Sequence, residues 1–184
     1  FTVGFVGSLK PWHGLPLLAD AFVRLHRTHG DSRLLVVGDG PERGPIEAAL
    51  DRHGLTQAAL FTGAVSHERV GGYLAAMDVG VAPYATQSDF YFSPLKVFEY
   101  MAAGLPVVAS RVGQLAELVD HQNNGLLCNP GDASGLADAL GLLRGDAGLR
   151  KRLGEAGRQT VLTGHTWDLD RKSTRLNSSH QIIS

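Results

Sequence analysis

Short apolar runs alternate along this chain with longer segments in which apolar residues recur every three or four positions. The first pattern is typical of strands buried on both faces, and the second of helices with one buried face. A chain that alternates the two builds βαβ units and a parallel sheet. We expect six strands, at Thr2–Val6, Arg33–Val37, Ala59–Thr62, Asp78–Ala82, Val107–Ser110 and Gly125–Leu127.

The segments between these strands predict helices that cross from one strand to the next. The first carries an apolar stripe of leucine, alanine and phenylalanine, and Gly54 ends the second. The expected helices are Leu15–His29, Glu42–His53, Glu68–Ala76, 94–103, Ala116–Val119, Ser134–Leu143 and Ala147–Leu162. The predicted fold class is therefore α/β, a doubly wound, mostly parallel six-stranded sheet of the Rossmann-like type.

Ligands of such sheets bind beyond the carboxyl ends of the strands. Residues that carry the function should therefore come from the loops at that edge, which are 7–14, 38–43, 63–67, 84–93 and 110–114.

Composition narrows the class of protein. The 184 residues are 43% hydrophobic and 19% charged, and the net charge of −1 argues against nucleic acid as a partner. No apolar run approaches the ~20 residues of a membrane helix. Cys128 is the only cysteine, so no disulfide can form within the chain, and we expect a packing residue in a cytoplasmic protein. The histidines lack the paired spacing of metal ligands.

The two ends of the sequence do not fit the pattern between them. The chain begins without Met, directly in the apolar run FTVGFVG, so we expect coding sequence upstream. Residues 171–184 show no hydrophobic period and resemble translated sequencing adapter, so we expect a non-native or disordered tail.

The most informative stretch is SPLKVFEYMAAGLPVVAS, which begins at Ser93. Ser93 is a good N-cap, and Pro94 suits the first helical position, where no N–H is needed. The amides near Leu95 then face outward at the positive end of the helix dipole, and Lys96 adds a full charge. This combination predicts a binding site for an anion.

Glu99 extends that site, because it lies three residues after Lys96 on the same helical face. The rise from Pro94 to Glu99 is roughly 7.5 Å, about the separation of a diphosphate from the ribose hydroxyls of a nucleotide. A carboxylate can accept from two vicinal hydroxyls at once. The helix therefore predicts a nucleoside diphosphate site. A surface helix with a solvated Lys and Glu is the alternative.

The first loop, GSLKPWHG, is a second candidate for anion binding, because Gly7 allows close approach of the backbone. Its spacing is neither that of a P-loop nor that of a dinucleotide fingerprint. We expect Trp12 to pack, whereas His13 is either a phosphate donor or the solvated end of the loop. The side chains that can contact an anion are Ser8, Lys10 and His13.

Two further loops are less specific. GDGPER carries Gly38 and Gly40, but Arg43 stands where a dinucleotide fingerprint needs its third Gly, which argues against a nicotinamide cofactor. We keep both glycines as substrate-binding candidates, although tight turns alone would explain them. The loop 84–93 is aromatic and polar and carries Tyr91 just before the anion-binding helix, which favours a functional role.

Four segments, in this order and spacing, resemble the C-terminal, donor-binding half of a family-4 glycosyltransferase of the two-domain GT-B class: GFVGSLKPWHGLPLLADAF, LLVVGDGPER, FTGAVSHERVGGYLAAMDVGVAPY and SPLKVFEYMAAGLPVVASRVGQLAELV. The resemblance implies a nucleotide-sugar-binding domain at residues 1–168 and a missing N-terminal domain with the acceptor site and any contact with a membrane. It implies retaining transfer of a sugar from a nucleotide diphosphate-sugar to an unknown acceptor, with no cofactor and usually no essential metal.

The resemblance also implies roles for particular residues. Glu99 matches the second Glu of the family's Glu-x7-Glu motif, which holds the donor ribose. Lys96 and the amides of Ser93–Leu95 would face the diphosphate, with the loop 7–14 covering it from the other side. Val65 would lie beside the base.

Three positions depart from the family pattern. Tyr91 stands where the first Glu of the motif belongs, Ser8 replaces the usual Arg and His13 the usual Lys. Lys10 and Lys96 are the candidates for supplying the lost charge, and Lys96 and Tyr91 are the catalytic candidates. The rival functions are a non-catalytic nucleotide-binding module and a GT-B sugar-nucleotide epimerase.

Overall fold

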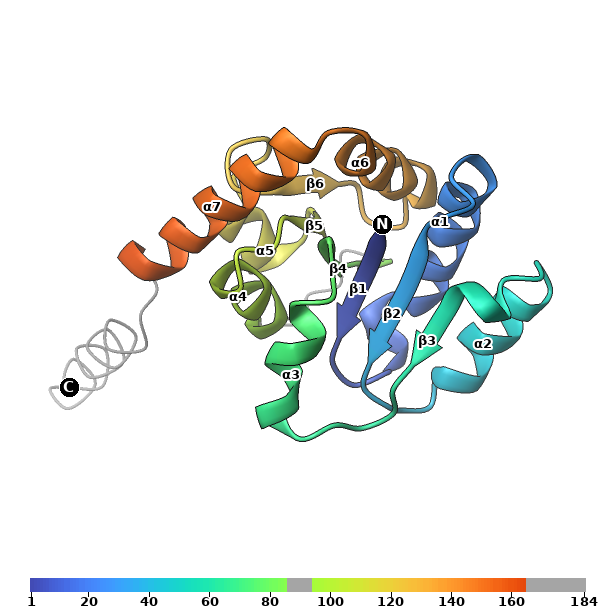
Figure 1. The fold of residues 1–184 in the computed structure, drawn as a ribbon. Helices are drawn as coiled ribbons and strands as arrows, with labels where there is room; N and C mark the ends of the chain where they lie inside the picture. Colours follow the sequence, from blue (N-terminus) through green and yellow to red (C-terminus); the bar gives the residue numbers. More distant parts are fainter. Residues whose placement is uncertain (86–93, 165–184) are drawn as a thin grey trace, which may run out of the picture.

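The computed structural model describes residues 1–85 and 94–164, and these residues form one six-stranded parallel sheet (Figure 1). Its strand order, β3-β2-β1-β4-β5-β6, confirms the predicted doubly wound α/β fold. The strands are β1 (Thr2–Val6), β2 (Arg33–Val37), β3 (Ala59–Phe61), β4 (Val79–Ala82), β5 (Val107–Ser110) and β6 (Leu126–Cys128).

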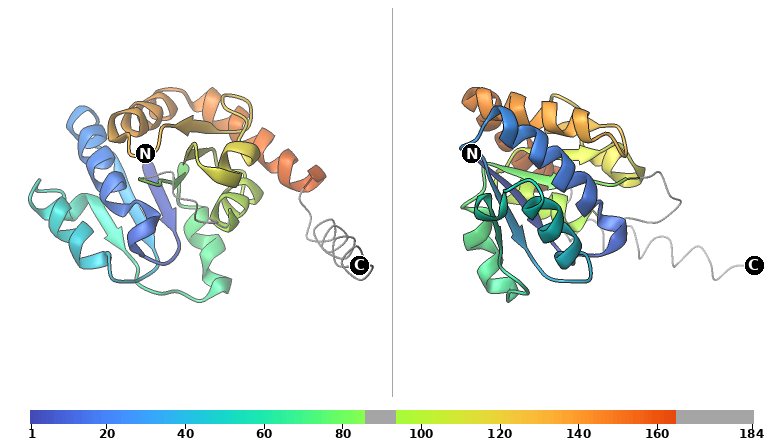
Figure 2. Two further views of the ribbon diagram at one scale, coloured as in Figure 1. Left: turned by 180° about the vertical axis from the view of Figure 1, so that it is seen from behind. Right: turned by 90° about the vertical axis from the view of Figure 1, so that its right-hand side faces the viewer.

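Helices cover both faces of this sheet. Helix α1 lies over the face of the sheet that the left view of Figure 2 shows, and residues of α2 and α6 belong to the same hydrophobic core. Residues of α3, α4 and α5 build the core on the opposite face. The helices are α1 (Leu15–Thr28), α2 (Arg43–Asp51), α3 (His67–Leu74), α4 (Leu95–Ala102), α5 (Gly113–Leu118), α6 (Ala133–Gly145) and α7 (Ala147–Gly164), with short 3₁₀ helices η1 (Pro11–His13) and η2 (Thr56–Ala58).

Helix α4 packs closely against β4. Val97, Tyr100 and Met101 on its inner face are completely buried, and Gly80 of β4 makes room for them. A Cβ at Gly80 would come within 2.4 Å of the Tyr100 ring. The bare backbone of β4 therefore lets an aromatic side chain lie flat against the sheet.

The strand order reverses between β1 and β4, and there the two strands separate. Strand β1 pairs with β2 along its whole length, from Thr2 to Val6. It pairs with β4 only at Val3 and Gly4. The carboxyl ends of β1 and β4 are thus not joined by a ladder, which is the place where doubly wound sheets bind ligands.

Most predicted elements are confirmed within one or two residues at each end. Helix α5 begins at Gly113, three residues before the position we expected. Ser66 is the N-cap residue of α3, and its side chain makes no capping hydrogen bond. The predicted tail, 171–184, lies outside the described residues. No helix in residues 1–85 or 94–164 is long and apolar enough to cross a bilayer.

Candidate functional site

Helix α4 presents its first turn to the carboxyl edge of the sheet. It begins at Leu95, and Pro94 is its N-cap residue rather than the first helical residue that we expected. The Pro94 carbonyl accepts from the amides of Val97 (2.9 Å) and Phe98 (3.1 Å). The amides of Leu95 and Lys96 precede these bonds and have no acceptor within the helix, which is the arrangement that binds anions. Ser93, the predicted cap, lies outside the described residues.

The Lys96 side chain is buried, not solvated. Only 9% of the residue is exposed, and Nζ has no hydrogen-bond partner among residues 1–85 and 94–164. Nζ lies 4.2 Å from the centre of the Phe5 ring and 5.9 Å from that of Tyr84. Aromatic faces attract a cation but accept less strongly than an oxygen. A buried amine in this setting is costly until an anion reaches it.

Burial also changes the ionisation of this amine. It lowers the pKa of Lys96 to about 7, against the opposing effect of the Glu99 carboxylate. Close to neutral pH the amine is therefore charged in only part of the molecules. A diphosphate beside Nζ would raise that pKa again, because it stabilises the charged form.

The first loop passes directly over the Lys96 amine. Gly7 has a φ of +141°, and a Cβ at this position would lie 3.4 Å from Nζ of Lys96. Ser8 is exposed and Lys10 is half-buried in the same loop. The structure thus brings Gly7 and Lys96 together, as the diphosphate hypothesis requires, and keeps Ser8 and Lys10 on the adjoining surface.

His13 is a half-buried part of this loop rather than its solvated end. Its Nδ1 hydrogen-bonds with the Ser8 carbonyl. Its ring centre lies 6.1 Å from that of Phe5 and 6.2 Å from that of Tyr84. Burial, followed by the charge of Lys96, lowers the pKa of His13, while the Ser8 carbonyl opposes the change. The positive charge of Lys96 therefore disfavours the protonated form of His13.

Trp12 corrects one expectation from the sequence. We expected it to pack, but it is 50% exposed on η1, and its ring meets that of His13 at a steep angle of 69°. The 3₁₀ turn that begins at Pro11 was not predicted, and it turns the indole outward.

Gly38 and Gly40 hold the first loop in place. A Cβ at Gly38 would lie 2.0 Å from the Gly7 carbonyl oxygen, and one at Gly40 would lie 2.6 Å from that of Leu9. Backbone bonds tie the two loops together, from Leu9 to the Asp39 carbonyl (2.9 Å) and from the Glu42 amide to the Leu9 carbonyl (3.0 Å). This close fit gives both glycines a packing role, and their contact with a substrate stays a prediction.

The same edge continues to the loop between β3 and α3. The Gly38 amide donates to the Gly63 carbonyl at 3.1 Å. Val65, two residues further on, is half-buried at the margin of the second core. Glu99 is half-buried on α4, the helix that belongs to the same core. The candidates for diphosphate, ribose and base therefore lie on the α3 and α4 side of the sheet.

One buried hydroxyl, that of Ser110, fixes the backbone just after β4. Ser110 Oγ accepts from the Tyr84 amide (2.8 Å) and donates to the Tyr84 carbonyl (3.1 Å). Pro83, between β4 and Tyr84, has no N–H to continue the ladder. The sequence placed both residues in loops of this edge, 84–93 and 110–114, but could not show that they contact each other. Tyr91 lies outside the described residues.

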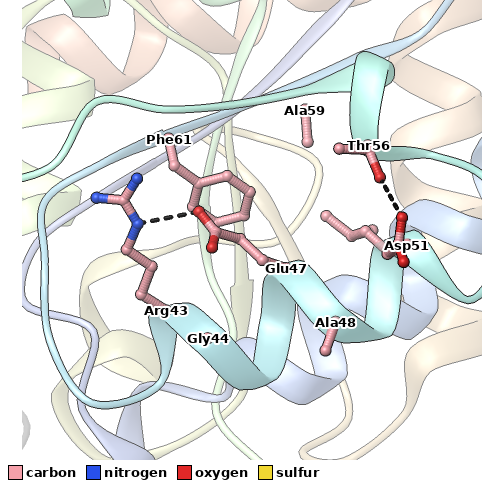
Figure 3. A pocket seen from close by; sticks show the side chains of 9 residues that line it. Arg43, Gly44, Glu47, Ala48, Asp51, Thr56, Ala59 and Phe61 are labelled. Atoms are coloured by element: carbon pink, nitrogen blue, oxygen red, sulfur yellow. Dashed lines mark hydrogen bonds and ion pairs between the residues drawn. The ribbon is translucent and has the colours of Figure 1, made fainter.

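A pocket of about 610 Å³ lies between α2 and β3, the outermost strand on the β2 side of the sheet (Figure 3). Its polar groups already have partners. Arg43 Nε is 2.9 Å from a Glu47 oxygen, and Thr56 Oγ1 donates to Asp51 at 2.8 Å. No unsatisfied polar group marks it as a ligand site, in contrast to the buried amine beside Gly7. Within the described ranges, no three His, Cys, Asp or Glu side chains are placed to hold a metal ion.

Comparison with known proteins identifies the family. Residues 1–146 match the family model described as "Glycosyl transferases group 1". This chain belongs to the group 1 glycosyltransferases. It is 30% identical over 163 residues to the glycogen synthase of Mycobacterium tuberculosis, covering 89% of this chain and 38% of the relative. It is 36% identical over 165 residues to a lipopolysaccharide core biosynthesis glycosyltransferase of Rhizobium meliloti, covering 89% of this chain and 45% of that protein.

Solved structures agree on the fold of this group 1 glycosyltransferase chain. The C-terminal domain of a group 1 glycosyltransferase from Francisella tularensis superposes with a TM-score of 0.80 at 22% identity, covering 91% of this chain and 87% of that one. Sucrose-phosphate synthase from Thermosynechococcus elongatus gives 0.84 at 29% identity, covering 100% of this chain and 46% of the other. The chain spans less than half the length of the curated relatives named here.

Proposed function

We propose that this chain binds the nucleoside diphosphate part of a nucleotide-sugar between the ends of β1 and β4, and that the protein transfers the sugar to an acceptor with retention of configuration. The observation that carries the proposal is the buried Nζ of Lys96, which lacks a hydrogen-bond partner in the described part of the chain and lies against Gly7. A protein of similar fold, HepE of Anabaena, has been solved in complex with UDP-glucose, at a TM-score of 0.83 and 24% identity.

The proposed chemistry is electrostatic. The bond between the anomeric carbon and the diphosphate oxygen breaks, and its electron pair leaves with the diphosphate. The acceptor oxygen bonds to the same face of that carbon, and its proton passes to the departing diphosphate. The first-turn amides of α4 and the Lys96 ammonium stabilise the charge that develops, a kind of contact whose removal costs ~10²–10³ in rate.

Glu99 is the proposed ribose ligand, and its substitution tests the site. We expect Glu99→Ala to weaken binding of the preferred nucleotide-sugar at least about tenfold, because two hydrogen bonds to a charged acceptor are lost. Thermal-shift screening of the wild-type chain against UDP-, GDP- and ADP-sugars identifies that ligand, and calorimetry then gives both affinities.

Glu117→Ala is the matched control, since Glu117 is exposed on α5. It should leave the affinity unchanged. A wild-type chain that binds none of these nucleotides would refute the proposal, and equal affinities for wild type and Glu99→Ala would remove Glu99 from the site.

A further inference from the structure

The Tyr100 hydroxyl stands between two backbone groups that belong to different strands. It accepts from the Val6 amide of β1 at 2.8 Å and donates to the Val81 carbonyl of β4 at 3.2 Å. Tyr100 is completely buried, and burial raises its pKa, so that the hydroxyl keeps the proton that it donates. The hydroxyl thus makes one hydrogen bond as acceptor and one as donor, and Tyr100 has no part in the proposed transfer of the sugar.

The two hydrogen bonds of Tyr100 replace one particular rung of the ladder between β1 and β4. The register Val3↔Val79 and Gly4↔Gly80 continues, two residues on, to Val6 opposite Ala82. In a parallel ladder, the amide of a residue donates to the carbonyl of the residue before its partner. The next rung would therefore join the Val6 amide directly to the Val81 carbonyl. The Tyr100 hydroxyl lies between these two groups and takes the place of their direct hydrogen bond.

The insertion separates the two strands. A direct rung holds donor and acceptor at about 2.9 Å. With a hydroxyl between them and a roughly tetrahedral angle at its oxygen, the bonds of 2.8 and 3.2 Å place the amide and the carbonyl roughly 5 Å apart. The ladder between β1 and β4 consequently ends at Gly4, and the strands diverge toward the loop that begins at Gly7.

The amine of Lys96 lies beside this opening. Tyr100 follows Lys96 by four residues on α4, so the two side chains share one face of the helix. Lys96 Nζ lies against Phe5, the β1 residue just beyond the last rung, and against Gly7. The width of the opening thus sets the distance between the amine and the loop proposed to cover the diphosphate.

We propose that Tyr100 is a positioning residue for diphosphate binding, because its hydroxyl, inserted between Val6 and Val81, holds β1 and β4 apart and so places Lys96 against the Gly7 loop. The inference rests on the proposed nucleotide site and adds a residue that touches no ligand. It predicts that loss of the hydroxyl impairs recognition of the phosphates and not of the nucleoside.

The test is Tyr100→Phe in the 184-residue chain, titrated with UDP and with uridine and followed by NMR. GDP with guanosine and ADP with adenosine are titrated in the same way. For the base that the wild type prefers, we expect the diphosphate to bind at least about tenfold more weakly to Tyr100→Phe, as for loss of one well-placed charged contact. The matching nucleoside should bind within twofold of the wild type.

Asn124→Ala is the matched control for stability. Asn124 is also buried, and it ties the backbone near β6 through the Asp120 amide and the Leu118 carbonyl. It should lower stability and leave the ratio of the two affinities unchanged. The inference fails if Tyr100→Phe keeps the wild-type ratio, or if Asn124→Ala shifts the ratio as much. A wild type that binds no diphosphate would instead refute the proposed function.

A measurement on the wild type covers the case in which Tyr100→Phe does not fold. If the inserted hydroxyl sets the site, the bound diphosphate must in turn stabilise that arrangement, since coupling between two equilibria is reciprocal. We expect saturating UDP, or the preferred diphosphate, to slow hydrogen exchange of the Val6 amide, and the nucleoside to leave it unchanged. Equal effects of the two ligands would overturn the inference.

Discussion

Replacing Lys96 by Met should make the chain more stable and a weaker binder at the same time. Met is unbranched like Lys and one atom shorter, so it removes the amine and suits a site lined by Phe5 and Tyr84. Lys96 Nζ has no hydrogen-bond partner in the described part of the chain. Its removal therefore deprives no other described group of a hydrogen bond.

The size of the gain follows from the ionisation of the amine. Its pKa falls from an ordinary value of 10.5 to about 7, and this difference corresponds to roughly 5 kcal/mol of unfavourable free energy for the charged form. Between these two pH values the unfolded chain holds a proton that the folded chain has lost, so wild-type stability rises with pH. We therefore expect Lys96→Met to exceed the wild type in unfolding free energy by about 4 kcal/mol at pH 7, and by progressively less toward pH 10.5.

The same substitution should weaken nucleotide binding although it raises the free energy of unfolding. A bound diphosphate raises the pKa of Lys96, so the wild type must take up a proton to bind once the pH exceeds about 7. Its affinity should then fall by up to about tenfold per pH unit. Lys96→Met cannot take up that proton, so it should bind about 10–100-fold more weakly than the wild type at pH 6 and show no such decline.

Two assays measure these effects. Urea unfolding at pH values from 6 to 10 gives the difference in stability, and calorimetry with the preferred nucleotide-sugar gives the affinities. A nucleotide-sugar is used because its diphosphate is esterified at both ends and does not titrate in this range. Lys151→Met is the control, because Lys151 is 77% exposed beside Glu155 and should change stability by less than about 0.5 kcal/mol. A Lys96→Met chain less stable than the wild type at pH 7, or a difference that does not shrink with pH, would refute this reasoning.

Two further predictions concern the frame of the site. Gly38→Ala should destabilise the chain by more than about 3 kcal/mol in urea unfolding, because the new Cβ would meet the Gly7 carbonyl oxygen at 2.0 Å. Gly44→Ala in α2 is the control. Nothing lies within 4 Å of a Cβ at Gly44, so this substitution should be neutral or stabilise the chain by about 0.5–1 kcal/mol. A tolerated Gly38→Ala would argue against the locked loop. Ser32→Ala should stabilise the chain by about 1 kcal/mol, since its buried hydroxyl has no partner among the described residues, and should leave nucleotide affinity unchanged, because Ser32 precedes β2 at the opposite edge of the sheet.

The sheet could be predicted because its strands are short apolar runs with clear ends. The bounds of Thr2–Val6, Arg33–Val37 and Val107–Ser110 are those observed, since Gly or a polar residue follows each run and burial on both faces leaves no competing pattern. Helix α5 was misplaced because it opens with Gly113, a residue that weakens a helical signal.

The site could be predicted only in part, because its environment comes from distant segments. The sequence marks Lys96 and Gly7 as candidates but cannot show that the amine is buried against Phe5, some ninety residues earlier in the chain. The same holds for Tyr100, which looks like one more apolar position on the inner face of α4. Its hydroxyl matters because it reaches the backbone of two strands at once. Such roles depend on the register between strands, which hydrophobic periodicity does not specify.

Two features at the carboxyl edge of the sheet lower the stability of the chain, and both are explained by the proposed binding of an anion. A direct rung between Val6 and Val81 would extend the ladder, and an apolar side chain in place of Lys96 would fill the core. The chain has instead a hydroxyl in the rung and an amine without an acceptor. Departures from the most stable arrangement persist where function requires them. Here the two departures are about one helical turn apart on α4. Together they meet the requirements of the anion site that we propose, an opening between β1 and β4 with an amine beside it.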